Sequence, residues 1–319
     1  MTKALQSRKL TLGFHQVSRP QAAPPSWLLN SLGSRSSNHP LYTEATLAMP
    51  ATLDQIVAAR RRSVGKLKAA ADLRDLERRA ESQAPPSFRA ALERSEAGEI
   101  AVIAELKKAS PSRGLIRGDF DVDRLASGFA KAGAAALSVL TEEEFFQGSL
   151  GNLELAAERS GLPCLRKDFM VDEFQVIEAR AAGASAILLI VAALNQADLT
   201  HFQQQARKFG LDVLCEVHDE DELRRAIDAG FDVIGVNNRN LHTFEVDLST
   251  ATRLAVSMPK GVLKVAESGI HSAEDIRRLR DAGYDAFLIG ESLMKAADPA
   301  QALQALIAYA KPKVAVPQP

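Results

Sequence analysis

Carboxylates and lysines recur directly after short apolar runs of this sequence, and side chains of these types can transfer protons. Glu105 and Lys107 stand two residues apart, so they would share one face of an extended strand. Lys167, Glu216 and Glu267 follow later apolar runs. Crowding of such groups in an apolar-walled cavity shifts their pKa values, which general acid–base catalysis near neutral pH requires. A structural ion-pair network is the alternative interpretation.

The last two apolar runs end in glycine and serine, in the segments Glu267-Ser268-Gly269 and Gly290-Glu291-Ser292. Small residues let backbone N–H groups approach an anion, and the N-terminus of a following helix adds partial positive charge. Ser110 and Ser292 offer hydroxyl donors. We therefore expect a phosphorylated small-molecule substrate; the alternative is that these glycines only make tight turns.

Eight apolar runs are expected to be the strands that position these residues. Most are continuous and not alternating, as expected of a parallel sheet that is covered on both faces. They are Ile100–Glu105, Ala135–Leu140, Pro163–Arg166, Ala186–Val191, Val213–Glu216, Val233–Val236, Leu263–Ala266 and Ala286–Ile289. Helical stretches such as Glu220–Ala229 and Ser272–Ala282 lie between them.

A glycine ends each helical stretch, four times in closely similar phrases such as Asp228-Ala229-Gly230 and Asp281-Ala282-Gly283. A residue with positive φ at a helix C-terminus satisfies the last carbonyls, and glycine adopts that conformation without strain. These glycines are Gly98, Gly133, Gly161, Gly183, Gly210, Gly230, Gly261 and Gly283.

Repeated strand-then-helix units predict an α/β fold, a single (β/α)8 TIM barrel, in which the C-terminal ends of all strands face one cavity. A doubly wound open sheet is the second interpretation, but no Gly-x-Gly-x-x-Gly follows a strand, which weakens any dinucleotide site. The segment 53–96 predicts two or three extra helices before the first strand that cover one end of the barrel.

The chain is expected to hold one domain, at residues 49–312, between an N-terminal extension of residues 1–48 and a C-terminal tail of residues 313–319. The extension has no Asp or Glu before Glu44 and repeats Ser, Pro, Arg and Lys, so it is expected to be disordered. This composition also resembles an organellar transit peptide. We expect a cytoplasmic protein, with import into an organelle as the alternative if the extension is such a peptide.

Composition narrows the function classes. Hydrophobic residues make up 46% and charged residues 25% of the chain, as in ordinary globular domains. The net charge of −1 favours neither nucleic acid nor an anionic membrane as a partner, and no apolar run reaches the roughly 18 residues of a membrane helix. Cys164 and Cys215 are expected in the core. The histidines are scattered, so no metal site and no Ser-His-Asp triad is expected, and His218 is interpreted as structural or solvent-exposed.

Four strand-end motifs resemble those of the indole-3-glycerol-phosphate synthase family, over roughly Leu53 to Ile307. They are the run Ile103-Ala104-Glu105-Leu106-Lys107-Lys108-Ala109-Ser110-Pro111-Ser112-Arg113-Gly114, the run Leu165-Arg166-Lys167-Asp168-Phe169, the run Gly235-Val236-Asn237-Asn238-Arg239-Asn240-Leu241, and Ala266-Glu267-Ser268-Gly269-Ile270. The resemblance implies a carbon–carbon carboxy-lyase of tryptophan biosynthesis without a cofactor. Its substrate would be 1-(2-carboxyphenylamino)-1-deoxyribulose 5-phosphate, which loses CO2 and water. A monomer or weak homo-oligomer is expected.

The resemblance also implies residue roles. Lys167 would be the acid of ring closure, Glu216 the acid–base partner for dehydration, Lys107 the ligand of the substrate carboxylate, and Glu105 would orient the lysines. The division of proton transfers between Lys107 and Lys167 stays open, because interacting groups titrate as a set. The implied substrate contacts are Asn237, Arg239, Glu267, Ser268, Phe146 and Phe169, and the implied phosphate contacts are Ser110, Ser268, Gly269, Gly290, Glu291 and Ser292.

Two other functions remain as alternatives. A sugar-phosphate isomerase similar to phosphoribosylanthranilate isomerase would share the barrel, but it would use a Cys/Asp or Asp/Asp pair where this chain has Glu105 and Lys107. A barrel kept as a non-catalytic binding or scaffold subunit should have lost at least one charged strand-end residue, and none is missing.

Overall fold

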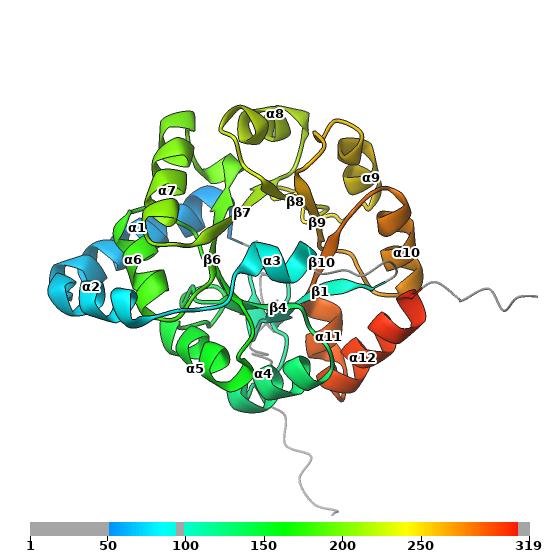
Figure 1. Cartoon of the computed structure of the whole chain (residues 1–319), viewed down its shortest axis with the longest axis horizontal. Helices are drawn as coiled ribbons and strands as arrows, with labels where there is room; N and C mark the ends of the chain where they lie inside the picture. The colour runs from blue at the N-terminus through cyan, green and yellow to red at the C-terminus, as the bar shows by residue number, and fades with distance from the viewer. Residues whose placement is uncertain (1–50, 94–98, 312–319) are drawn as a thin grey trace, which may run out of the picture. The chain divides into compact units, whose positions relative to one another are not determined.

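The computed structural model describes residues 51–93 and 99–311, and in them eight parallel strands close into a barrel (Figure 1). Around the barrel the strands pair in the order β1-β10-β9-β8-β7-β6-β5-β4. Their bounds are β1 Ala101–Leu106, β4 Ala136–Leu140, β5 Cys164–Lys167, β6 Ala186–Ile190, β7 Asp212–Val217, β8 Val233–Asn237, β9 Leu263–Glu267 and β10 Ala286–Ile289. The first and last strands pair, with Ile103 opposite Leu288, so the predicted barrel is confirmed and the open sheet is wrong.

A ring of helices covers the outside of the barrel (Figure 1). They are α4 Val122–Lys131, α5 Leu150–Ser160, α6 Phe174–Ala181, α7 Gln196–Lys208, α8 Glu220–Asp228, α9 Ser249–Ala255, α10 Ala273–Asp281, α11 Glu291–Lys295 and α12 Pro299–Ala310. Every predicted helix-end glycine within the described residues has a positive φ, from 63° at Gly161 to 95° at Gly283. The predicted glycine repeat is therefore confirmed there; Gly98 lies outside the described residues.

The barrel strands alternate between two cores. Val102, Ala104 and Leu106 of β1 pack outward against the helices. Ala101 and Ile103 point inward and join the apolar interior of the barrel. This period of two places Glu105 at the next inward position of β1, directly above the interior core. The same alternation determines which residue of each strand faces the cavity.

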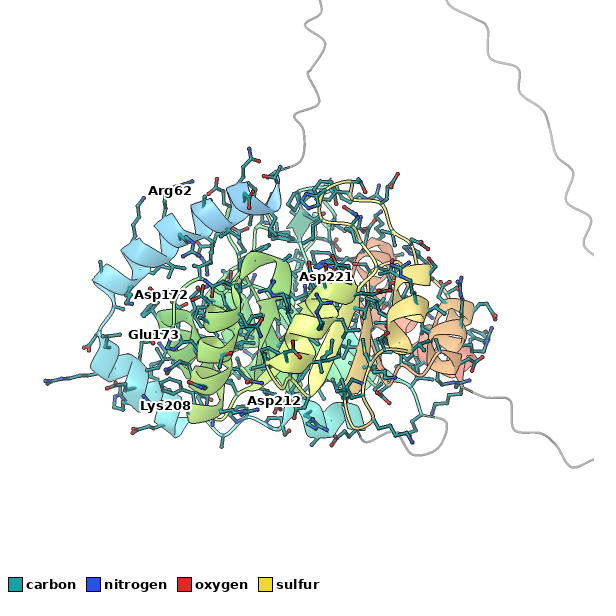
Figure 2. The ribbon with its side chains drawn as sticks, turned by 90° about the horizontal axis from the view of Figure 1, so that it is seen from above. Arg62, Asp172, Glu173, Lys208, Asp212 and Asp221 are labelled. Atoms are coloured by element: carbon teal, nitrogen blue, oxygen red, sulfur yellow. The ribbon has the colours of Figure 1, made fainter. Side chains whose placement is uncertain are left out.

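Three helices precede β1, and each occupies a different place. They are α1 Leu53–Ala70, α2 Leu73–Ser82 and α3 Phe88–Glu93. The side chains of Phe88 and Leu92 of α3 are fully buried in the interior core, so α3 closes the amino-terminal end of the barrel, and α2 packs on α6. Helix α1 runs on the opposite side of the strands from α3 (Figure 2). The expectation that these helices share one end is therefore wrong, because their apolar faces match different surfaces.

Hydrogen bonds stabilise the beginnings of α3 and α1. The carboxylate of Asp212, at the start of β7, accepts hydrogen bonds from Ser87 Oγ and the Arg89 N–H at the beginning of α3 (Figure 2). Thr52 and Gln55 form a capping box that begins α1.

Two short strands, β2 Ala109–Ser110 and β3 Gly114–Leu115, form a hairpin after β1, and a 3₁₀ turn, η1 Val191–Ala193, follows β6. No described helix is both long and apolar enough to cross a membrane.

Candidate active site

One cavity at the carboxyl ends of the strands is lined by all the residues that the sequence suggested for catalysis and binding. The charged members are Glu105, Lys107, Lys167, Glu216, Arg239, Glu267 and Glu291, and the others are Ser110, Phe146, Phe169, Asn237, Ser268, Gly269, Gly290 and Ser292. They are far apart in the sequence and meet because each follows a strand of the same closed barrel.

Two glycines make room for the buried carboxylates of the cavity. A Cβ atom at Gly290 would overlap with Oε2 of Glu105, and a Cβ atom at Gly235 would overlap with Oε1 of Glu267. Gly235 lies in β8, next to β9, which carries Glu267, and Gly290 directly follows β10, the neighbour of β1, which carries Glu105. Gly290 therefore makes room for a buried carboxylate of the site, which is a role that its sequence position did not reveal.

Lys167 is the centre of a chain of charges inside the barrel. Its Nζ donates to Oε2 of Glu216 at 2.9 Å and lies 3.7 Å from Oε2 of Glu267. Asn237 donates to the other oxygen of Glu216 at 3.1 Å. Beside this group, Nζ of Lys107 lies 2.5 Å from Oε2 of Glu105. Both lysines and all three carboxylates therefore line the same cavity.

Burial and mutual charge move the pKa values of this cluster in opposite directions. Burial alone lowers the pKa of Lys167, but the negative charges of Glu216, Glu267 and Glu105 outweigh it and raise the pKa above its usual value. Burial raises the pKa of Glu216, but Lys167 and His218 outweigh burial and hold that pKa well below its usual range. Burial and the charge of Glu216 raise the pKa of Glu267. Glu216 is thus a carboxylate, and Glu267 is the group that holds a proton more readily.

The turns after β9 and β10, which also line this cavity, have the backbone geometry of an anion site. Ser268 and Gly269 both have positive φ, 61° and 78°, in the turn after β9. Serine adopts this conformation rarely, and such strain is typical of functional turns. Gly290 begins α11 without a side-chain cap, so the first N–H groups of that helix have no partner from a capping side chain.

Two phosphate candidates have partners within the protein. The Glu291 carboxylate pairs with Arg239 at 3.2 Å, Lys295 at 2.6 Å and Arg113 at 3.2 Å. The hydroxyl of Ser292 donates to the carbonyl of Ile270 at 3.0 Å. Among the implied phosphate contacts, this leaves backbone N–H groups and the hydroxyls of Ser110 and Ser268 as candidate donors for an anion.

Aromatic and aliphatic side chains line the rest of this cavity. The rings of Phe146 and Phe169 lie 6.1 Å apart between centroids. The buried carboxylate of Glu142 accepts hydrogen bonds from the N–H groups of Phe145 and Phe146, at 2.8 and 3.1 Å, and so holds the loop that carries the Phe146 ring. A flat aromatic substrate would therefore meet a fixed apolar wall.

Several residues of the cavity wall have no signal in the sequence that places them there. Leu53 and Ile56 reach it from α1, and Leu241 and Phe244 reach it from the loop after β8. Helical spacing indicated a helix at Leu53 and Ile56, but no local signal says that this helix lies beside the strand ends. Among residues 51–93 and 99–311, no group of three His, Cys, Asp or Glu side chains is arranged to hold a metal ion.

Known proteins match this chain over nearly the whole barrel. The family model described as indole-3-glycerol phosphate synthase matches residues 53–306. An indole-3-glycerol phosphate synthase of Koribacter versatilis is 59% identical over 260 residues, which cover 81% of this chain and 100% of that protein. Indole-3-glycerol phosphate synthase 2 of Ralstonia nicotianae is 47% identical over 246 residues, which cover 76% of this chain and 92% of that protein.

The solved structure of 3-hexulose-6-phosphate synthase from Salmonella typhimurium shares the fold alone. Its TM-score is 0.54 at 13% identity, over 66% of this chain and 98% of that one. The family model and the two relatives say more than the fold, because they cover the strand ends at which the charged cluster lies. By these matches, the chain belongs to the indole-3-glycerol phosphate synthase family.

Proposed function

We propose that this chain catalyses the reaction that its family name describes. The substrate is 1-(2-carboxyphenylamino)-1-deoxyribulose 5-phosphate, and the product is indole-3-glycerol phosphate, with one CO2 and one water released. A carbon–carbon bond forms between the aromatic ring and the ketone carbon. Ring closure therefore needs a proton for the ketone oxygen, and dehydration needs an acid and a base near the hydroxyl that forms there.

Lys167 is the general acid of ring closure in this proposal. Its ammonium group points into the cavity from the end of β5 and is charged at neutral pH, because the surrounding carboxylates raise its pKa. A charged ammonium group in a site with little water polarises a ketone and stabilises the alkoxide that develops. Substrate binding would replace the 2.9 Å contact to Glu216 with a contact to the ketone oxygen.

Glu216 is the base that assists dehydration. Its side chain is 2% exposed, and its lowered pKa keeps it ionised and able to accept a proton. Asn237 and Lys167 hold its two oxygens from opposite sides, so the carboxylate is oriented before the substrate arrives. Preorganisation of this kind lowers the cost of reorganising the site during the reaction.

The remaining residues bind and orient the substrate. Lys107, which Glu105 holds at 2.5 Å, is the ligand of the substrate carboxylate. Phe146 and Phe169 hold the aromatic ring, while Glu267, Ser268 and Asn237 contact the hydroxyls and the anthranilate group. Arg239 supports this end through Glu291. The N–H groups of Gly269, Gly290 and Ser292 and the hydroxyl of Ser110 bind the phosphate.

The observation that carries the proposal is the Lys167–Glu216 pair, an acid and a base in contact at 2.9 Å in a cavity that also contains the proposed anion site. The isomerase alternative needs a Cys/Asp or Asp/Asp pair at these strand ends, and the described cavity lining contains no cysteine or aspartate. A non-catalytic barrel has no need for a buried cluster of this cost.

Formation of indole-3-glycerol phosphate, followed by fluorescence, tests the proposal. We expect turnover of the carboxyphenylamino substrate by the purified full chain in the presence of EDTA and without added nucleotide. A Lys167→Ala preparation purified in parallel controls for contaminating enzyme from the host. Absence of turnover in the wild-type protein, or equal turnover in both preparations, would contradict the assignment.

A further inference from the structure

His218 lies directly behind the proposed base. Strand β7 continues to Val217, so His218 follows on the same side as Glu216. Its Nε2 lies 3.3 Å from Oε1 of Glu216, and its Nδ1 lies 2.9 Å from Oε2 of Glu222 on α8. The side chain is 12% exposed. The interpretation of His218 as structural or solvent-exposed therefore leaves out its contact with the catalytic cluster.

We propose that His218 is a positioning residue for Glu216: its imidazolium keeps the base ionised and oriented, and Glu222 keeps the imidazole charged. The inference rests on the proposed function, because it concerns the group that accepts the proton. No step is assigned to His218 on the substrate itself.

The charge balance around Glu216 explains why a second cation is needed. Glu216 shares its cavity with the carboxylates Glu105 and Glu267, and burial disfavours its ionised form. Lys167 is its other cationic contact, and Lys167 loses its positive charge when it donates a proton as the general acid. At that moment His218 is the cation that remains against Glu216 and prevents it from being neutralised.

Helix α8 fixes Glu222 in the place where it can hold His218. Asp219 caps the helix and accepts from the Glu222 N–H at 2.9 Å. Oε2 of Glu222 in turn accepts from the His218 N–H at 2.8 Å and contacts Nδ1 at 2.9 Å. This arrangement fixes the ring by backbone geometry and leaves Nε2 directed toward Glu216. In the described structure Nε2 faces Oε1 of Glu216 at 3.3 Å without hydrogen-bond geometry, so the contact there is one between charges.

The surroundings favour the charged imidazole. His218 and Glu222 line a second hollow beside the active site, toward α1, the loop after β8 and α9. Besides Glu222, the acidic residues that line it are Asp54, Asp219, Glu245 and Asp247. Besides His218, the basic residues that line it are Arg239, His242 and Arg253. Burial alone lowers the pKa of His218, but Glu216 and Glu222 outweigh burial and raise the pKa to about 10. The ring is therefore an imidazolium throughout the neutral range.

A pair of conservative variants separates a charge effect from a packing effect. In His218→Gln a side-chain donor remains but the charge is lost, and we expect kcat to fall by about tenfold to a hundredfold, the range for one close interaction with a charged group, with little change in KM. In Glu222→Gln the pKa of His218 falls. That variant should match the wild type at low pH and approach His218→Gln at high pH. The double variant should follow His218→Gln at every pH.

The matched control is His201→Gln. His201 forms an exposed pair with Glu173 at 3.0 Å, outside the active-site cavity, so its loss should leave kcat and the pH profile unchanged. Thermal unfolding of each variant checks that it is folded. Wild-type kcat in His218→Gln, or a wild-type pH profile in Glu222→Gln, would overturn the inference.

A measurement without substrate keeps this test independent of the proposed function. Nitrogen-15 NMR of the imidazole in the wild-type chain should show His218 protonated at pH 7 and titrating in the alkaline range, at a lower pH in Glu222→Gln. A neutral His218 at pH 7 overturns the inference even if the enzyme is active. A wild-type protein that shows the expected titration but no turnover contradicts the proposed function instead.

Discussion

Two clusters of charged side chains occupy opposite sides of β5, an inner one of lysines and glutamates and an outer one built on arginines and Asp168. Lys167 points into the barrel, whereas its neighbours Arg166 and Asp168 point outward, toward α6 and α1. Asp168 accepts from Arg60 of α1 at 2.5 Å and from Thr141 at 2.7 Å, and its other oxygen accepts from the Phe169 N–H at 2.8 Å. The outer cluster therefore links α1 to the strand that carries the proposed acid.

The two clusters differ in where their unpaired atoms lie. In the outer cluster, each side-chain nitrogen of Arg166 donates a hydrogen bond, to Thr141 or Asp168, to the Gln175 carbonyl, and to Glu178, whereas Nε of Arg60 is buried without a partner. In the inner cluster, Oε1 of Glu267 and Nε2 of His218 are buried without a hydrogen-bond partner. These two residues line cavities, where another molecule can meet them.

The comparison shows that burial of charge does not by itself indicate a catalytic site. The outer cluster contains residues as deeply buried as the inner one, with Arg166 and Asp168 at 1% and 0% side-chain exposure. Its charges compensate one another without a substrate, and its residues do not line the active-site cavity. Position beside that cavity is what distinguishes the proposed catalytic set.

The largest expected effect separates the clusters by activity. We expect Lys167→Ala to lower kcat by about 10²- to 10⁴-fold, the usual contribution of one general acid, while the protein stays folded. Steady-state kinetics and circular dichroism measure the two parts. Lys208→Ala, at the exposed end of α7 (Figure 2), is the control and should behave as the wild type. Near-normal turnover in Lys167→Ala would show that the acid is another residue.

The next largest expected effect separates the two clusters by their contribution to the stability of the folded protein. Asp168→Ala leaves Arg166 and Arg60 buried without their common partner, so we expect a loss of about 3–5 kcal/mol in the free energy of unfolding. Thermal unfolding measures this loss as a fall in Tm of roughly 6–20 °C. Asp221→Ala on α8 removes an exposed carboxylate (Figure 2) and should change stability by less than about 1 kcal/mol. Equal Tm values for the two variants would contradict the structural role of the outer cluster.

A smaller effect concerns the pH dependence of stability. The pKa of Glu267 is raised in the folded protein, so its contribution to stability is fully present below the unfolded pKa of about 4.3 and is lost as pH rises through the folded pKa. Glu267→Gln removes that dependence. Urea unfolding at pH 5, 7 and 9 should therefore show the variant gaining stability relative to the wild type as pH rises. If the free energies of unfolding of the two proteins changed in parallel with pH, Glu267 would be ionised in the folded protein without a loss of stability.

The smallest effect compares two links between α1 and the rest of the barrel. Arg60 makes the buried link to Asp168, and Lys68 makes an exposed link to Asp172 at 2.9 Å (Figure 2). We expect Lys68→Gln to cost about 0–1 kcal/mol, because solvent screens exposed pairs, and Arg60→Gln to cost clearly more. Thermal unfolding of both variants decides the point. A larger loss for Lys68→Gln would reverse the assigned order.

Most of the barrel could be predicted from local patterns. The run from Ala286 to Ile289 has the same bounds in the prediction and the structure, and the others differ by a residue or two at their ends. Apolar runs and helix-end glycines repeat locally, and each reports a conformation that neighbouring residues impose. The positions of α1 and α3 could not be predicted in this way, because they depend on which distant surface their apolar faces match.

The sequence by itself determined the barrel, the inward alternation that presents Glu105, Lys167 and Glu267 at the strand ends, and the family, because those depend on residue types and short spacings. Tertiary structure decided the rest. Gly290, which follows β10, makes room for Glu105 of β1 although the two residues are far apart along the chain, and His218 meets Glu216 and Glu222 only because α8 packs back on β7. Pairing and burial at such contacts set the pKa values, and no single segment of the chain carries that information.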